Sequence, residues 1–339
     1  MPNPRLRRAR ERASLTQAEL ADQAGVSRQL VGSAEAGRHS PAVDTALRMA
    51  AVLGEPVETL FGDPPAAPGS VLGGALREGE AVVVGRVGTR LYAAPLASLA
   101  AGDAAWAAPD GIVEGGAIRL FPGSRPTGLV VVGCDPVLGL CQSLLSRGGA
   151  RRVVAVSGTT GSALAALEGG RAHAALVHGP EDALPEPPAA TRRVHLARWR
   201  VGIGLSAEHR MRSLEALLAG RVPLVQREES AASQQALVRA AGDRTPRAAA
   251  RARGHVDAAR RAAIAGCAAV TFEPAARQHG LRFLPLEMHA VELWIDEPWI
   301  DHPGARALVE LLGSAAFRDR VRLIGGYDLE GCGSPVRAA

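Results

Sequence analysis

The chain has 339 residues, of which 47% are hydrophobic but only 3% aromatic, and a formal net charge of +5. This length exceeds the usual size of one domain, so two or three units are expected, with cores of Ala, Val and Leu. No run of about 18 apolar residues is present, which argues against a membrane span. The Arg-rich start lacks a following apolar run, so no secretory signal is expected and the protein is predicted to be cytoplasmic.

Near the start of the chain, the sequence predicts two short helices joined by a tight turn. Thr16 followed by Glu19 has the spacing of a capping box at the start of the first helix. Gly25 can adopt the positive φ needed in the turn, Ser27 can cap the second helix, and Gly37 is expected to end it. Two helices joined by a short turn that contains Gly are the signature of a helix-turn-helix. Further helices are expected at residues 5–13, 45–53 and 57–61.

This region resembles the XRE (Cro/repressor-type) helix-turn-helix family through LTQAELADQAGVSRQLVGSAEAGRHSP and the following ALRMAAVLG. The resemblance implies an all-α domain at residues 1–62 that binds double-stranded DNA. It also implies a structural ion pair between Arg10 and Glu35. The DNA-binding residues that it implies are Gln17, Arg28, Gln29, Gly32, Ser33 and Arg38.

These residues have different implied roles. Arg28, Gln29 and Ser33 would read base edges, and Gln17 would contact a phosphate group. Arginine suits guanine and glutamine suits adenine in the major groove. Gly32 departs from the polar residue usual in the family, so its base would be read poorly. The alternative is a helical interaction module that has lost DNA binding.

A Pro- and Gly-rich linker at residues 63–70 separates this head from the rest of the chain. Residues 71–127 are predicted to form a small β-rich connector, with turns at residues 88–89 and 115–116. The connector is expected to pack on the domain that follows or to act as a plain spacer. A dimerising or docking surface is a further interpretation of the same segment.

From residue 129 onward, buried apolar strands alternate with helices, which predicts a parallel α/β sheet. Ligands of such sheets bind at the carboxyl ends of the strands, where the polar turns at residues 133–136 and 157–162 are expected. Strands are expected from residue 129 and at 152–156, 172–177, 201–205, 224–225, 268–272, 281–286 and 291–295. Helices are expected at 137–146, 163–168, 213–219, 230–241, 256–265, 274–279, 304–312 and 314–320.

The order of these elements resembles the type II periplasmic-binding-protein fold in its cytoplasmic, PBP-like version. The matching segments are VVVGCDPVLGL, VSGTTGSALAALEGGRAHAALVHG, GHVDAARRAAIAGCAAVTFEPAARQHGLRFLPL and GGYD. The resemblance implies a multidomain chain whose residues 128–339 form two α/β lobes that close on a ligand. Lobe I would comprise about 129–198 and 288–339, and lobe II about 199–287.

Relatives in the molybdate branch hold an oxyanion with hydroxyl groups and with backbone N–H groups at helix N-termini, where the helix dipole favours an anion. The ligand-binding residues implied here are Ser157, Thr159, Thr160, Ser230, Ser233, Tyr327 and Asp328. Two family positions differ, because Gln234 replaces an arginine and Ala231 replaces a hydroxyl residue. A larger or less charged ligand is therefore favoured more than the family implies. Each Ser or Thr could instead be a plain helix cap.

No catalytic set is recognisable in the sequence. The segment SGTTGS lacks the Lys of a P-loop, and no nucleophile–base pair is apparent. His173 and His178 flank an apolar strand and are expected to be structural. The cysteines form no CxxC pair and lie near no histidine cluster at zinc spacing, so free thiols, no metal site and no cofactor are expected. The cysteines are Cys134, Cys141, Cys267 and Cys332.

The leading hypothesis is a ligand-responsive transcriptional regulator that is not an enzyme. It would bind DNA as a homodimer on two half-sites about one helical turn apart. A small molecule or an oxyanion such as molybdate would close the cleft and change the geometry of the paired heads. One alternative is an enzyme or accessory protein of molybdenum-cofactor metabolism, and another is a DNA-binding architectural protein that senses nothing.

Overall fold

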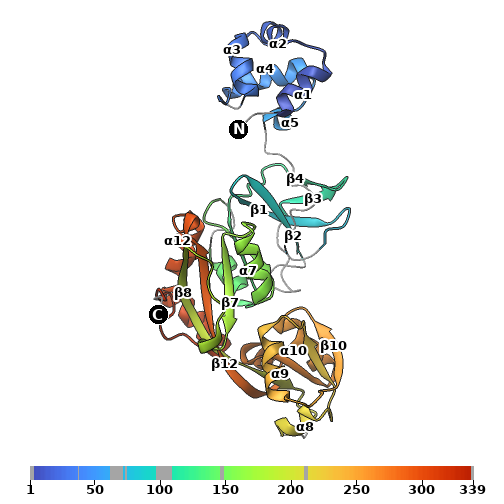
Figure 1. The fold of residues 1–339 in the computed structure, drawn as a ribbon, viewed down its shortest axis with the longest axis vertical. Coiled ribbons are helices and arrows are strands. Elements are labelled where there is room, and N and C mark those ends of the chain that lie inside the picture. Colours follow the sequence, from blue (N-terminus) through green and yellow to red (C-terminus); the bar gives the residue numbers. More distant parts are fainter. Residues whose placement is uncertain are drawn as a thin grey trace. The chain divides into compact units, whose positions relative to one another are not determined.

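The computed structural model describes residues 4–36, 38–61, 72, 75–96, 109–145, 149–209 and 213–336. The chain divides into two compact units, Met1–Pro65 and Ala66–Ala339. Each is described by itself below (Figure 1). Among the residues described, no helix is long and apolar enough to cross a membrane.

The described part of the first unit, called the head, folds into five helices. They are α1 (Pro4–Arg12), α2 (Gln17–Gln23), α3 (Arg28–Glu35), α4 (Val43–Leu53) and α5 (Val57–Phe61). Their apolar faces meet in one core around the fully buried Leu20, Val31 and Met49. The expected end of α3 at Gly37 lies outside the described residues, and Ala36 caps the helix.

The local signals at the start of α2 and α3 are confirmed. The Thr16 hydroxyl accepts a hydrogen bond from the Glu19 backbone N–H at 3.2 Å, and the Glu19 carboxylate accepts from the Thr16 N–H at 2.7 Å. Gly25 adopts a φ of +64° in the turn. The Ser27 hydroxyl then accepts from the backbone N–H of Leu30 at 3.2 Å. These contacts satisfy N–H groups that the first turn of a helix leaves without a partner.

The second unit begins with a four-stranded antiparallel sheet in the order β2-β1-β3-β4. Its strands are β1 (Ala81–Val87), β2 (Arg90–Pro95), β3 (Gly111–Glu114) and β4 (Ala117–Leu120). This connector packs on the domain that follows, because Val83, Val87 and Tyr92 share a core with Val130 and Val154. The connector is therefore part of the second unit.

Lobe I opens with three parallel strands. The elements are β5 (Leu129–Gly133), α6 (Val137–Leu144), β6 (Val153–Ser157), α7 (Thr160–Glu168) and β7 (Ala174–Gly179). The chain returns to this lobe after lobe II, where Leu308 of α12 joins the core that contains Leu129. The returning elements are α12 (Pro303–Leu312), α13 (Ala315–Ile324) and the short β13 (Tyr327–Asp328).

Lobe II is built from shorter elements around a second core. They are α8 (Leu214–Leu218), β9 (Leu224–Arg227), α9 (Ala232–Ala241), β10 (Ala248–Ala252), α10 (His255–Ala265), β11 (Ala268–Phe272) and α11 (Glu273–Gln278). The strand β10 was not predicted; its exposed and half-buried alanines and arginine give no apolar run. It pairs in parallel with β9 at the edge of the sheet.

Two long strands connect the lobes, and here the sequence-based prediction was wrong. β8 (Thr191–Leu205) and β12 (Arg282–Asp296) each have 15 residues and pair antiparallel along their length. The described strands of the two lobes therefore form one mixed sheet in the order β10-β9-β11-β8-β12-β7-β5-β6, with β13 paired to β8, rather than a parallel one. Figure 1 shows β12 leading from the yellow and orange lobe II to the green and red lobe I.

The errors in these strands have a local cause. Arg192, Arg193 and His195 interrupt the apolar pattern at the start of β8. In β12 the register shifts between Pro285 and Glu287, so a proline lies inside a strand at a bulge, where the missing N–H is tolerated. The sequence pattern therefore reads as two separate short strands.

We predict that Gly32→Ala stabilises the head. A Cβ on Gly32 would meet only the Gln17 side-chain oxygen, at 3.6 Å, which is an ordinary contact. Alanine is favoured over glycine inside a helix by roughly 0.5–1 kcal/mol, so the melting midpoint of the head should rise by a few degrees. Gly25→Ala is the matched control and should lower the midpoint, because its φ is +64°. Calorimetry of the full chain measures both, and a lower midpoint for Gly32→Ala would contradict the prediction.

The buried His173 leads to a prediction about pH. Its Nδ1 accepts the Val130 backbone N–H at 2.8 Å, and its ring stacks on His302. Burial, with a smaller contribution from His302, lowers the pKa of His173 from 6.5 to about 3. Below pH 6.5 the unfolded chain therefore takes up a proton that the folded chain does not, and stability falls as the pH drops.

Between pH 7 and pH 5 this single group should cost about 2 kcal/mol of unfolding free energy. His173→Asn keeps an acceptor near the Nδ1 position but cannot be protonated. Urea unfolding of the second unit at the two pH values should show the variant losing about 2 kcal/mol less than the natural chain. Equal losses in the two proteins would contradict the assignment.

Candidate functional site

The first turn of α3 presents polar side chains to solvent. Arg28 and Gln29 are exposed there, and Arg38 is exposed just beyond the helix. Within the described part of the chain, neither Arg28 nor Arg38 has an ion-pair or hydrogen-bond partner for its guanidinium group. Ser33 is half-buried, and its hydroxyl donates to the Leu30 carbonyl at 3.1 Å. The two arginines are thus available to an external partner.

A buried carboxylate fixes α3 against the rest of the head. The Arg10 Nε donates to Glu35 at 2.6 Å, which confirms the expected ion pair. The Gln17 side-chain amide also donates to Glu35, at 2.7 Å. The expected phosphate contact of Gln17 stays a prediction, and the Gln17 side-chain oxygen lies 3.6 Å from where a Cβ on Gly32 would be.

The second unit gathers titratable side chains where the lobes meet. We call this set the interlobe cluster: Cys134, His178, Arg227, His255 and His289. Every member is buried. Lobe I supplies Cys134 just after β5 and His178 near the end of β7, while lobe II supplies Arg227 at the end of β9 and His255 at the start of α10. His289 lies in β12, opposite Trp199 of β8.

A buried aspartate next to the cluster connects several elements. The Asp135 carboxylate accepts hydrogen bonds from the Val137 N–H at 2.9 Å, the Trp199 Nε1 at 3.0 Å and the Tyr327 hydroxyl at 2.7 Å. Burial raises the pKa of Asp135, and burial together with Asp135 raises the pKa of Tyr327 well above 10. Tyr327 therefore stays a neutral donor.

The histidines form a chain of close contacts. The Nδ1 atoms of His178 and His289 lie 2.9 Å apart, and the Nε2 of His289 lies 2.6 Å from a Glu287 oxygen. The His178 ring also packs on Trp199, with centroids 4.6 Å apart. Burial, followed by nearby cations and imidazoles, lowers the pKa values of His178 and His255 well below 6.5. Both rings are therefore neutral near pH 7.

Arg227 is the unusual member of the cluster. It is 1% exposed, yet among the described residues its Nε and Nη1 atoms have no hydrogen-bond partner. Its Nη2 donates to the Arg253 carbonyl at a long 3.4 Å. Burial lowers its pKa. The Ser233 hydroxyl, in the first turn of α9, is also 1% exposed and without a partner in the described chain.

Three of the ligand-binding residues expected from sequence lie at or beside the cluster. Thr160 donates its hydroxyl to the His178 carbonyl at 3.1 Å and so positions that histidine. Tyr327 reaches Asp135, and Ser233 is buried at the start of α9. Thr159 caps α7 through the Ser162 N–H, as a plain cap would.

The other expected residues lie elsewhere. Ser157 is half-buried at the end of β6, and no contact joins it to the cluster. Ser230 is exposed at a turn, because α9 begins two residues later than expected. Asp328 is 52% exposed and lies 3.9 Å from Arg198 on the surface. That Ser157, Ser230 and Asp328 contribute to the ligand-binding cleft stays a prediction.

Most of the interlobe cluster was missed from sequence. The sequence has no cysteine near a histidine cluster at zinc spacing, but the fold brings ligand atoms of Cys134, His178 and His255 within 4.8 Å of one another. These residues are far apart in the chain, so no short motif joins them. The one available signal was their position at strand ends and helix starts. Gln234, which stands where the resemblance implies an arginine, accepts the Arg227 backbone N–H at 2.9 Å.

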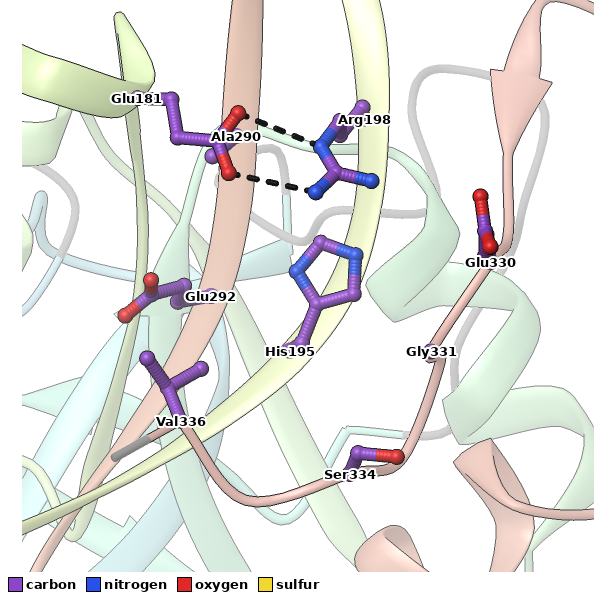
Figure 2. A pocket seen from close by; sticks show the side chains of 9 residues that line it. All are labelled: Glu181, His195, Arg198, Ala290, Glu292, Glu330, Gly331, Ser334 and Val336. Carbon is purple, nitrogen blue, oxygen red and sulfur yellow. Dashed lines mark hydrogen bonds and ion pairs between the residues drawn. The ribbon is translucent and has the colours of Figure 1, made fainter.

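A separate surface hollow of about 420 Å³ lies along β8 and β12. Figure 2 shows the ion pair between Glu181 and Arg198 on one side and the final segment of the described chain on the other. Glu292 also lines the hollow but is held by Arg193 at 2.7 Å. Glu181, Arg198 and Glu292 are thus paired, whereas the Nε2 of the lining His195 is buried and has no hydrogen-bond partner among the described residues.

Each of the two units contains a segment that matches a known family. Residues 6–60 match the family model described as "Helix-turn-helix", and residues 143–313 match the "PBP superfamily domain". An uncharacterized HTH-type transcriptional regulator from Methanothermobacter thermautotrophicus is 44% identical over 57 residues, which cover 16% of this chain and 83% of that protein.

Among solved structures, a putative phosphate ABC transporter substrate-binding protein with bound phosphate from Clostridium perfringens is 8% identical. It matches with a TM-score of 0.47 over 59% of this chain and 98% of that chain. The restriction-modification controller protein C.AhdI from Aeromonas hydrophila is 32% identical, with a TM-score of 0.17 over 17% of this chain and 89% of that chain. By its family matches, the chain belongs to the helix-turn-helix transcriptional regulators through its head and to the PBP superfamily through residues 143–313.

Proposed function

We propose that this protein is a transcriptional regulator whose PBP-like domain binds a small acidic effector between its lobes and thereby controls the binding of the head to DNA. The observation that carries the effector part is the buried guanidinium group of Arg227, two of whose nitrogens lack partners. An uncompensated buried charge is strongly unfavourable. A carboxylate or oxyanion would accept paired hydrogen bonds from such a planar group.

The surroundings of Arg227 fit an anion. The partnerless hydroxyl of Ser233 adds a donor at the same end of β9. The carboxylate of Asp135 accepts its three hydrogen bonds from other residues, and among the described residues it forms neither a hydrogen bond nor an ion pair with Arg227. Molybdate is one member of the class that this chemistry admits, together with phosphate, sulfate and small carboxylic acids.

The position of the cluster links binding to movement. Arg227 belongs to lobe II, whereas His178 belongs to lobe I, and only β8 and β12 pass between the lobes as long strands. A ligand that contacts both lobes favours the closed arrangement over any open one by its differential affinity. In a homodimer, closure would change the spacing of the two heads on DNA half-sites.

The DNA-binding part leads to a prediction for Arg28. Because its side chain is exposed and unpaired within the described chain, Arg28→Ala should weaken binding to a promoter fragment by about 1–3 kcal/mol, roughly 5- to 150-fold. Arg7→Ala is the matched control: it removes the same charge from α1, where Arg7 is paired with Glu11 at 2.8 Å. Fluorescence anisotropy at fixed salt measures both.

The fragment should come from the protein's own genomic neighbourhood. Equal losses for the two variants would show that only net charge matters and would contradict base reading by Arg28. If the natural chain shifts no such fragment at modest salt, with or without effectors, the regulatory function itself fails.

The effector part leads to a prediction for Arg227. In a thermal-shift panel of molybdate, tungstate, sulfate, phosphate and small carboxylic acids, a bound anion should raise the midpoint with concentration. Arg227→Met should abolish that rise. Without anion, the same variant should unfold at an equal or higher temperature, because an unpaired buried charge has been replaced by an apolar side chain.

Arg251→Met serves as the control for this experiment. Arg251 lies on β10, is exposed, and pairs with Glu229 at 2.8 Å. Its loss should leave the anion response unchanged. A response that survives Arg227→Met would show that the guanidinium group does not hold the effector.

A further inference from the structure

Three soft or borderline ligands meet inside the interlobe cluster. The thiol of Cys134 and the imidazoles of His178 and His255 place one ligand atom each within 4.8 Å of the other two. All three residues are buried. The Cys134 sulfur lies 3.8 Å from the His255 Nε2.

The separation between Cys134 and His255 is close to that of two ligands of one metal ion. Zinc binds thiolate sulfur at about 2.3 Å and imidazole nitrogen at about 2.0–2.1 Å, so tetrahedral ligands of these types lie roughly 3.5 Å apart. The Cys134–His255 separation exceeds this by a few tenths of an ångström. Small side-chain rotations would therefore be enough to bring both atoms to bonding distance.

The hydrogen bonds around His178 leave one nitrogen suited to a metal. The Glu287 carboxylate can only accept, so the Nε2 of His289 carries the proton that lies between them. The Nδ1 of His289 is then an acceptor, and the proton on the 2.9 Å contact belongs to the Nδ1 of His178. This assignment, made from the hydrogen-bond network, leaves a lone pair on the His178 Nε2.

The hydrogen bonds of His178 are of the kind that orient histidine ligands in metal sites. A metal-binding imidazole usually donates its other N–H to a fixed acceptor, which orients the ring. His178 does so to His289, and the Glu287 carboxylate completes the series. The adjacent Thr160 fixes the backbone of His178 from the other side.

His255 supplies an independent observation. Its Nδ1 is buried and without a hydrogen-bond partner in the described chain, and its Nε2 has only the thiol sulfur near it. A neutral imidazole always carries one lone pair, and here no strong donor occupies it. The backbone is nevertheless held, because Thr271 donates to the His255 carbonyl at 2.9 Å.

We infer that Cys134, His178 and His255 bind one borderline-soft divalent cation of the Zn²⁺ or Co²⁺ class, in a site that joins lobe I to lobe II. A set of one cysteine and two histidines favours such ions over Mg²⁺ or Ca²⁺, which prefer oxygen ligands. Binding transfers the thiol proton of Cys134 to solvent and forms a sulfur–metal bond.

The charge balance of this site follows from its neighbours. The cation and the thiolate together carry one positive charge, and Arg227 adds another nearby. Three protein ligands leave a fourth coordination position. An anion is the natural ligand for that position. The metal site would thus strengthen the anion binding proposed above, although its existence does not depend on that proposal or on DNA binding.

The test is titration of the tag-free full-length protein with Co²⁺ after chelator treatment. We expect one Co²⁺ per chain, with a thiolate-to-cobalt charge-transfer band in the near ultraviolet that added Zn²⁺ removes. Cys134→Ser should abolish the band and weaken Zn²⁺ binding by at least about 100-fold, beyond the 10- to 100-fold that loss of an outer partner costs. Cys267→Ser, which replaces another buried thiol, should change neither.

Two further variants keep the test decisive if Cys134→Ser folds poorly. His255→Gln removes a nitrogen ligand but leaves the thiol. His289→Gln keeps all three ligands and loses only the partner of His178, so the charge-transfer band should persist while Zn²⁺ affinity falls roughly 10- to 100-fold. Circular dichroism of each variant checks that the fold is kept.

The inference is overturned if no stoichiometric Co²⁺ is bound, or if Cys134→Ser and Cys267→Ser bind it equally. An anion response in the thermal-shift panel without any metal binding would overturn the metal site and leave the proposed effector function intact. Metal binding in a protein that shifts no promoter fragment would support the metal site and overturn the proposed regulatory function.

Discussion

The antiparallel pairing of β8 and β12 is the constraint on which the second unit depends. Its register sets Trp199 opposite His289 where the strands pass between the lobes. Trp199 then reaches Asp135 after β5, and His289 reaches His178 in β7. Because side chains alternate along a strand, a slip of either strand by one residue would turn its own ring to the other face of the sheet and separate Trp199 from His289. The interlobe cluster exists only in this register.

The cluster is also asymmetric in charge. Among the carboxylates near the cluster, Asp135 accepts three hydrogen bonds and Glu287 is held by His289 and Arg239. Glu228 and Asp257 attract Arg227 through charge, but neither forms a hydrogen bond with it among the described residues. The guanidinium group of Arg227 has no such partner. Burial of an unpaired cation destabilises the fold. Buried groups of this kind are found mainly at functional sites, where a ligand can bind the charge. The same reasoning separates this cluster from the surface hollow, whose charged groups are largely paired.

Local signals in the sequence predicted the head well and the ligand site poorly. Thr16 and Glu19 bond to each other across three residues, and Gly25 makes its turn through its own φ, so both features can be predicted from local sequence alone. Contacts such as Cys134 with His255 join residues 121 positions apart, and only the pairing of whole strands brings them together. The long strands themselves were hidden because Pro285 and a run of arginines break the apolar pattern.

The packing of the connector on lobe I has a consequence for how these units can be exchanged. A Cβ on Gly85 would lie 2.2 Å from the Val130 side chain, and Arg152 holds Asp110 through two hydrogen bonds of 2.8 Å. A sensor excised at residue 128 would thus expose the valines of β5 and β6 and invite aggregation. The part of the chain that can be exchanged as a unit therefore starts at the linker and includes the connector. Recombination that joins this sensor to another head should keep the connector with the sensor.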